Sequence, residues 1–128
     1  MQKGIKPMND LDLVRQLAVR LYEKKAEDIT ALNVGHLTVL CEKMLIASGR
    51  SAAQVSSLCD AVDEFMNENG VPLRRSEGLR EARWAVLDYG FLIVHLFHRD
   101  DRAFYDLERL WTDGENRIDL PFDQTVQD

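Results

Sequence analysis

The chain has 128 residues, of which 45% are hydrophobic and 30% charged, so it is long enough for one domain with a core built from several elements. Its formal net charge of −6 argues against a phosphate-binding surface as the main function and suits a basic partner instead. No apolar run approaches the ~20 residues of a membrane helix, and residues 1–7 lack the apolar core of a signal peptide, so we expect a cytoplasmic protein with no membrane partner.

Residues 9–25 predict an amphipathic helix. Asn9 or Asp10 can cap its N-terminus, and two lysines near its end suit the negative end of the helix dipole. Its apolar residues recur at helical spacing: Leu11, Val14, Leu17, Ala18 and Leu21. The simplest interpretation is a packing helix.

Two strands are predicted next, at residues 28–34 and 37–47, with a turn at Gly35-His36 between them. The pair Glu42-Lys43 interrupts the apolar pattern of the second strand. A charge pair at that position indicates that one face or one edge of the sheet is exposed there.

A second helix follows the sequence Ser48-Gly49-Arg50-Ser51. Ser51 and Gln54 have the spacing of a capping box, and Gly70 with Pro72 ends the helix. Its apolar stripe is formed by Val55, Leu58, Cys59, Val62, Phe65 and Met66. Because Cys41 and Cys59 both lie in apolar segments, we expect buried thiols.

The region after the second helix is predicted to be a loop at 71–83, containing at most a short edge strand. Two apolar strands then meet in a tight turn at Gly90, and a short helix starts near Asp100 or Asp101. The acidic segment 113–128 lacks periodicity and predicts a flexible tail.

These elements predict a single α/β domain over residues 1–112 with the order α-β-β-α-β-β-α. Such an order implies a mixed sheet of four to five strands with helices on at least one face, because each apolar stripe needs burial. Residues 113–128 are expected to lie outside this domain.

Most of the aromatic residues lie between Trp84 and Trp111. On the last strand, alternation places Phe91, Ile93, His95 and Phe97 on one face, with Leu92, Val94 and Leu96 on the other. The aliphatic set suits a helix-covered core. The aromatic set, together with Trp84 and Asp88, has the composition of an interface, but it also fits a core under a second layer.

Enzymatic and metal-binding functions have weak support. Ser48-Gly49 before a helix could cradle a phosphate, but no Asp-x-Asp pair is present to hold a catalytic metal. His95 and His98 would point to opposite faces of a strand, and no Gly-x-Ser-x-Gly elbow occurs. We therefore expect no catalytic residues, no metal site and no cofactor.

The same stretch resembles the signature of the ribosomal silencing factors, also called Iojap-like proteins. The matching segments, in chain order, are Ala31-Leu32-Asn33-Val34, Ile46-Ala47-Ser48-Gly49-Arg50-Ser51, Gln54-Val55, Glu77-Gly78, Trp84, Asp88-Tyr89-Gly90, Ile93-Val94-His95-Leu96-Phe97 and Arg102 to Trp111. The resemblance spans residues 10–111 and implies a nucleotidyltransferase-like fold without the catalytic carboxylates.

The resemblance also implies a non-enzymatic repressor of translation that acts when nutrients are limiting. Proteins of this kind bind the large ribosomal subunit through its basic ribosomal protein number fourteen and block joining of the small subunit. The partner-binding residues implied at matching positions are Trp84, Asp88, His95 and Tyr105, and Phe97 and Glu108 are added by their position rather than by a strict match. Trp84 and Tyr105 would be apolar anchors, Asp88 and Glu108 would face basic side chains, and His95 would form a hydrogen bond.

Two positions depart from the family pattern. Phe91 stands where the family usually has Asp, and Lys43 replaces an aromatic residue. Two alternatives to the repressor remain: a nucleotidyltransferase-like enzyme that binds a nucleotide, and a homodimeric scaffold that uses the same aromatic face. No direct nucleic-acid site is expected.

Overall fold

The sheet is the framework on which every other element is placed. The computed structural model describes residues 8–126 and has five strands in the order β1-β2-β5-β4-β3. Their bounds are β1 Glu27–Asn33, β2 Lys43–Gly49, β3 Arg75–Glu77, β4 Trp84–Asp88 and β5 Leu92–His98. β2 and β5 pair in parallel and the other neighbours pair antiparallel, which confirms the predicted mixed sheet.

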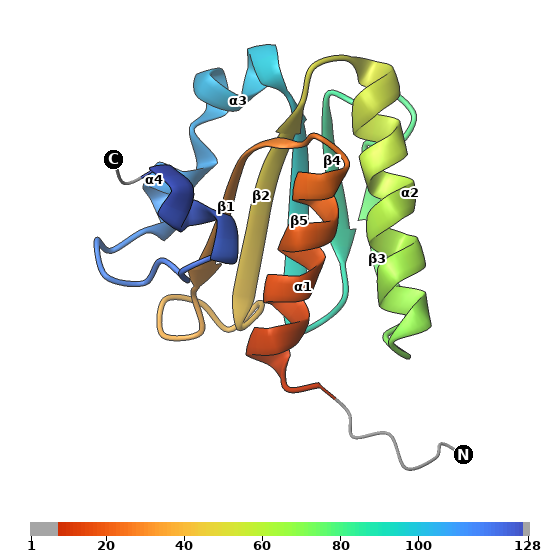
Figure 1. Cartoon of the computed structure of the whole chain (residues 1–128). Helices are drawn as coiled ribbons and strands as arrows, with labels where there is room; N and C mark the ends of the chain where they lie inside the picture. The colour runs from red at the N-terminus through yellow and green to blue at the C-terminus, as the bar shows by residue number, and fades with distance from the viewer. Residues whose placement is uncertain (1–7, 127–128) are drawn as a thin grey trace.

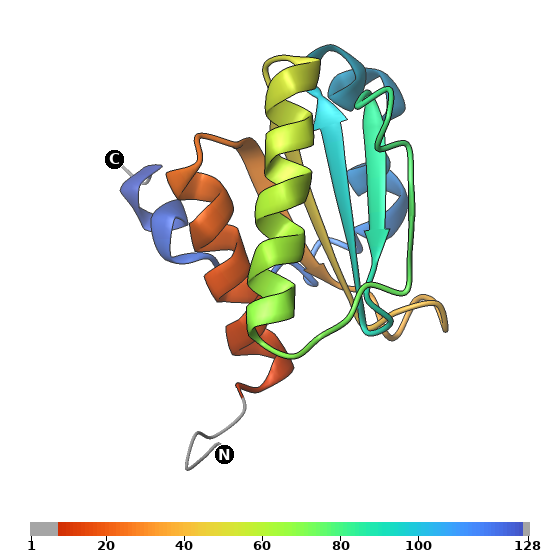
Figure 2. The same cartoon turned by 90° about the vertical axis from the view of Figure 1, so that its right-hand side faces the viewer.

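Two long helices, α1 (Asp10–Glu23) and α2 (Ala52–Glu68), lie side by side on one face of the sheet (Figures 1 and 2). Their apolar stripes bury the inward-facing side chains of the strands. The largest buried side chains of this main core include Leu17, Leu21, Leu45, Leu58, Met66, Leu87, Leu92 and Leu96. This face of the sheet is therefore closed.

Side-chain caps fix where both helices begin. The Asn9 side chain accepts a hydrogen bond from the Asp12 N–H at 2.8 Å, and the Ser51 hydroxyl accepts one from the Gln54 N–H at 3.1 Å. The Gln54 carboxamide accepts from the Arg50 N–H at 2.6 Å, so the capping box closes one residue earlier than its usual form.

The opposite face carries only two short helices, α3 (Arg99–Tyr105) and α4 (Leu107–Trp111), behind the sheet in Figure 2. Asp106 between them has a left-handed backbone with φ of 47°, which divides the single helix predicted from the sequence. A smaller core cluster lies under them, formed by Leu32, Val34, Cys41, Met44, Ile46, Phe97 and Leu107.

The predicted strand at 37–47 is correct only from residue 43. Residues 34–42 form a loop in which the Glu42 and Lys43 N–H groups both donate to the Phe91 carbonyl. Of the two alternatives for Glu42-Lys43, an exposed edge was wrong, because β2 lies between β1 and β5; Glu42 is exposed but precedes the strand, and Lys43 is half-buried at its start. Lys43 is accommodated at the first position of the strand, where its ammonium donates to Asn33 at 2.9 Å.

The prediction of a flexible tail from residue 113 is also corrected. Arg117 forms a β-bridge with Leu32, and Ile118 and Leu120 are 3% and 1% exposed within the main core. A 3₁₀ helix, η1 (Pro121–Val126), follows. Phe122 also packs against the main core, with its ring stacked on that of Tyr22, so apolar burial docks the segment.

Two parts of the sequence analysis lie outside the described residues: the absence of a signal peptide in residues 1–7, and the last two residues of the acidic segment. Among the helices in residues 8–126, none combines the length and the hydropathy needed to cross a lipid bilayer.

We predict that Gly78→Ala destabilises the fold more than Gly70→Ala. Both glycines have positive φ, 76° and 75°, so the left-handed backbone costs alanine about 1 kcal/mol at either site. A Cβ at Gly78 would also overlap the Trp84 carbonyl oxygen, whereas one at Gly70 meets open space. Urea unfolding should show at least about 1 kcal/mol of additional loss at Gly78; equal losses would contradict the overlap.

Candidate docking face

Side chains of β4 and β5 form the centre of the face that α1 and α2 leave open. In the antiparallel register Trp84 lies opposite Phe97, Val86 opposite His95, and Asp88 opposite Ile93. Their neighbours along each strand belong to the main core, so alternation sends these six residues to the other face. The predicted division is confirmed for residues 92–97, but Phe91 was placed wrongly: it precedes β5 and packs against the main core.

Trp84 and His95 are joined by a hydrogen bond. The Trp84 indole Nε1–H donates to His95 Nδ1 at 3.1 Å. Since an indole can only donate, His95 Nδ1 carries no proton and Nε2–H is the protonated nitrogen of the neutral ring. Burial lowers the pKa of His95 to about 4, so the ring is neutral at pH 7.

The second ring nitrogen of His95 remains available to a partner. The residue as a whole is only 9% exposed. Among the described residues, the fully buried polar side-chain atom without a hydrogen bond is Glu108 Oε1, and His95 Nε2 is not in that class. Nε2–H therefore reaches solvent as a fixed donor. In the predicted hydrogen bond to a partner, His95 would therefore be the donor through Nε2–H, because Nδ1 already accepts from Trp84.

An aromatic stack surrounds Trp84. Its ring lies 4.9 Å from the Phe97 ring and 4.8 Å from the Tyr105 ring, centroid to centroid. Phe97 is 0% exposed, whereas Tyr105 is 47% exposed. The sequence-based prediction that Phe97 binds a partner does not fit its burial; it supports Trp84 and Tyr105 from below.

Arg102 attaches α3 and α4 to the sheet. Its guanidinium, 7% exposed at residue level, donates to the Ser48 hydroxyl at 2.7 Å and to the Asp28 carbonyl at 2.6 Å. Its Nε and the same Nη2 that binds Asp28 donate to one carboxylate oxygen of Glu108, at 2.8 and 2.6 Å. These bonds connect β1, β2, α3 and α4, and so they hold Tyr105 in place over Trp84.

Glu108 is consequently committed to an internal ion pair. Burial raises the pKa of its carboxyl group, but the hydrogen bonds from Arg102 and from its own backbone N–H outweigh burial, and the pKa lies below its usual value. Its Oε1 is buried and has no hydrogen-bond partner within the described residues. The prediction that Glu108 faces a basic partner is replaced by a structural role.

Asp88 lies at the tight turn between β4 and β5. Its Oδ1 accepts a hydrogen bond from the Gly90 N–H at 2.8 Å, and the positive φ of Gly90, 93°, allows the chain to reverse there. The second carboxylate oxygen forms no ion pair within the described chain. Asp88 is partly exposed and so retains the predicted capacity to meet a basic side chain.

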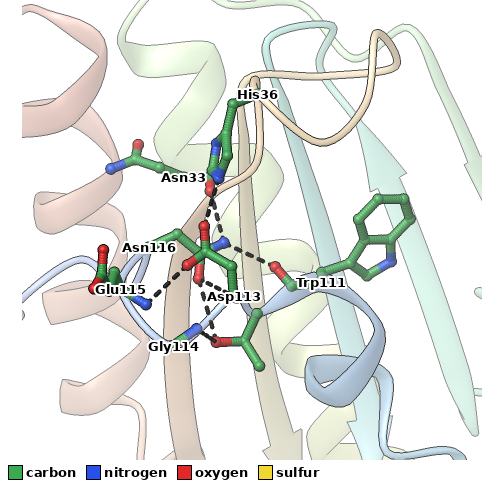
Figure 3. Close-up of polar contacts among 8 residues, drawn as sticks. Asn33, His36, Trp111, Asp113, Gly114, Glu115 and Asn116 are labelled. Carbon is green, nitrogen blue, oxygen red and sulfur yellow. Dashed lines mark hydrogen bonds and ion pairs between the residues drawn. The ribbon is translucent and has the colours of Figure 1, made fainter.

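A polar cluster around Asn116 secures one border of the face (Figure 3). The Asn116 amide donates to the Asn33 and Trp111 carbonyls, both at 2.8 Å, and its oxygen accepts from the Asp113 N–H at 3.0 Å. Asp113 in turn binds His36 Nε2 at 2.7 Å. The end of α4 and the loop after β1 are therefore tied together.

Several exposed apolar side chains near this face were missed by the sequence analysis. Phe104 on α3 and Leu110 on α4 are 80% and 72% exposed, and Val39 and Leu40 in the loop after β1 are 101% and 70% exposed. Phe104 and Leu110 lie in the resembling segment, so helical spacing could have placed them on the outer side of these helices. Val39 and Leu40 were assigned to a strand, which concealed them.

The structure also bears on the metal site and the cysteines considered from the sequence. Within residues 8–126 no three His, Cys, Asp or Glu side chains converge in a way that could hold a metal ion. Both cysteines are buried and free, and burial raises the pKa of Cys59 to about 11. The thiols are therefore protonated core groups, as expected.

The fold and this face together define a small α/β protein with one closed sheet face and one open face built around aromatic residues. The arrangement suits recognition of a macromolecule: rigid aromatic anchors, one fixed N–H donor and a carboxylate lie on adjacent strands.

Comparison with known proteins places the chain in a family. The family model described as "Ribosomal silencing factor during starvation" matches residues 7–128. The ribosomal silencing factor of Bacillus subtilis is 37% identical over 107 residues, covering 84% of this chain and 91% of the relative. The chloroplastic Iojap protein of Zea mays is 31% identical over 117 residues, covering 91% of this chain and 50% of that protein.

Solved structures agree with this assignment. A crystal structure from Chromobacterium violaceum is similar with a TM-score of 0.76 and 34% identity, covering 81% of this chain and 87% of that one. A Bacillus halodurans structure has a TM-score of 0.72 and 36% identity, covering 85% and 99%. The chain belongs to the ribosomal silencing factor family, which confirms the resemblance seen in the sequence.

We predict that the stability of the protein falls between pH 6.5 and pH 4 because of His95. Its pKa in the folded state is about 4, below the ordinary 6.5, so the unfolded chain binds a proton first as the pH falls. The free energy of unfolding should therefore decrease across this range, by up to about 3 kcal/mol.

The matched control for this prediction is His95→Gln, which keeps an acceptor for Trp84 but does not titrate. Chemical unfolding at several pH values should give a flatter profile for the variant. The carboxylates, including Glu108 with its lowered pKa, are present in both proteins, so their contributions cancel in the difference. Parallel profiles would show that His95 is not responsible.

Proposed function

We propose that this chain represses translation by binding the large ribosomal subunit through the open face of β4 and β5. The single observation that carries the proposal is the aromatic set on that face, in which half-buried Trp84 packs between buried Phe97 and exposed Tyr105. Membership of the ribosomal silencing factor family supplies the ribosome as the target.

The partner that this face suits is a basic protein, and we propose ribosomal protein number fourteen of the large subunit. Trp84 and Tyr105 would be the apolar anchors, His95 Nε2–H would donate a hydrogen bond, and Asp88 would meet a basic side chain. The net charge of −6 favours approach to a basic surface. Binding there would block joining of the small subunit by steric overlap, and no cofactor is needed.

A non-enzymatic mechanism is part of this proposal. The curated relatives are named as silencing factors and not as enzymes. On the open side, β4 contributes one carboxylate, Asp88, β3 contributes Glu77 and β5 contributes none, and in residues 8–126 no three His, Cys, Asp or Glu side chains converge to hold a metal ion. A nucleotidyltransferase reaction would need two or three converging carboxylates to hold its metal.

Sedimentation of purified ribosomal subunits on sucrose gradients, with and without the protein, tests the proposal. Co-migration with the large subunit, together with fewer joined ribosomes, is the expected result. If the protein stays out of the large-subunit fraction at micromolar concentration, the proposal fails. In that case a rise in melting temperature with nucleotide and Mg²⁺ would favour the enzyme, and self-association would favour the homodimeric scaffold.

We predict that Trp84→Ala weakens binding to the large subunit about thirtyfold, since losing a central aromatic anchor costs ~2 kcal/mol. Binding within twofold of wild type would contradict the proposed face. Circular dichroism should first establish that the variant is folded, because the removed ring also packs against Phe97.

Two tyrosines provide a matched comparison that does not depend on core packing. Tyr105 on the open face is 47% exposed, and Tyr22 at the end of α1 is 50% exposed. Tyr105→Ala should weaken binding, whereas Tyr22→Ala, which removes the same ring from a helix on the closed side, should leave it unchanged.

A further inference from the structure

A hollow of about 150 Å³ lies on the open face where β3, the edge strand, meets β4. Three strands contribute its lining: Arg75, Ser76, Glu77, Val86, Asp88 and Ile93. Val86 lies directly opposite His95 on β5, so the hollow is adjacent to the Trp84–His95 pair. It has the size of part of one side chain rather than of a nucleotide.

Strand register determines the arrangement of the lining. Glu77 lies opposite Val86, and Arg75 lies opposite Asp88. Glu77 and Asp88 are therefore diagonal neighbours, which places their positions about 7–8 Å apart across the hollow. Val86 and Ile93 lie between and beside them, so the floor is apolar and two walls carry carboxylates.

The charges of the lining are not neutralised internally. Across residues 8–126, neither Glu77 nor Asp88 forms an ion pair, and Arg75 forms none with the Asp88 it faces. Two carboxylates and one guanidinium give the hollow a formal charge of −1. Its potential therefore favours a cation, and the apolar floor favours one carried on an aliphatic stem.

We propose that this hollow binds the head of one lysine or arginine side chain of a protein partner. The cationic group would lie between Glu77 and Asp88, and its methylene stem would cover Val86 and Ile93. Glu77 is thereby assigned as a binding residue, and Arg75 as a residue that opposes binding. The inference rests on the proposed function, because it identifies a second contact beside Trp84 on the same face.

Because Glu77 and Arg75 have opposing roles, their replacement should change the binding affinity in opposite directions. With purified large ribosomal subunits in low-salt buffer, Glu77→Gln should weaken binding about tenfold, since it removes one charge-assisted hydrogen bond. Arg75→Gln should strengthen binding, because it removes a like charge from the rim. Both side chains are exposed, so neither variant threatens the fold.

Glu64→Gln is the control for net charge. Glu64 is exposed on α2, on the closed side of the sheet, and its replacement changes the charge by the same amount as Glu77→Gln. Its affinity should match that of the wild type. If Glu77→Gln weakens binding no more than Glu64→Gln does, or if Arg75→Gln weakens binding, the cation pocket is overturned.

Failure of this inference is distinguishable from failure of the proposed function. If the wild-type protein binds large subunits and Trp84→Ala weakens this binding, the docking face is supported. That result does not depend on the outcome for the Glu77 and Arg75 variants. If the wild type does not bind the subunits, both the proposed function and the proposed binding of a partner's lysine or arginine in the hollow are contradicted. Binding by the wild type with equal affinity for Glu77→Gln removes the pocket alone.

Discussion

The buried guanidinium of Arg102 is the interaction on which the open face depends. Only two short helices lie on that side of the sheet, and neither is long enough to be stable by itself. Arg102 connects them to Ser48 on β2 and to the Asp28 carbonyl on β1, and it pairs with Glu108. Ion pairs of Arg83 with Asp101 and of Arg99 with Glu27 also join α3 to the sheet, but Arg102 is buried and binds α4 as well.

The same arrangement would let the proposed docking face be both apolar and specific. Phe97 fills the space beneath Trp84, and the bond to His95 fixes the orientation of the indole ring. Rings held in this way lose little conformational entropy on binding, which lowers the cost of association. The neutral His95 ring adds a donor whose direction is set by its partner, so polar recognition does not require a mobile side chain.

Asymmetric coverage of the sheet separates stability from function in this domain. The main core under α1 and α2 contains most of the large buried aliphatic residues. The second cluster is small and borders the exposed aromatic residues. A substitution on the open face can therefore change binding while the main core preserves the fold, which is what makes the matched tyrosine comparison informative.

Periodicity and turn chemistry were sufficient to predict most of the elements. The capped starts of α1 and α2 and the turn at Gly90 depend on residues within a few positions of each other. Errors arose where distant contacts override local pattern. Residues 37–42 are apolar enough for a strand, but hydrogen bonds to the Phe91 carbonyl hold the end of this segment as a loop.

For the candidate site, the sequence by itself determined the family and the face on which Trp84, Asp88 and His95 lie, because alternation along a strand is a local property. Only the tertiary structure decided which of the predicted residues are accessible. Phe97 is covered by neighbouring rings, and Glu108 is bound by Arg102, whose other partners lie 54 and 74 residues away in the chain. Burial and pairing of this kind depend on contacts between distant segments, and the same is true of the docking of Ile118 and Leu120 into the main core.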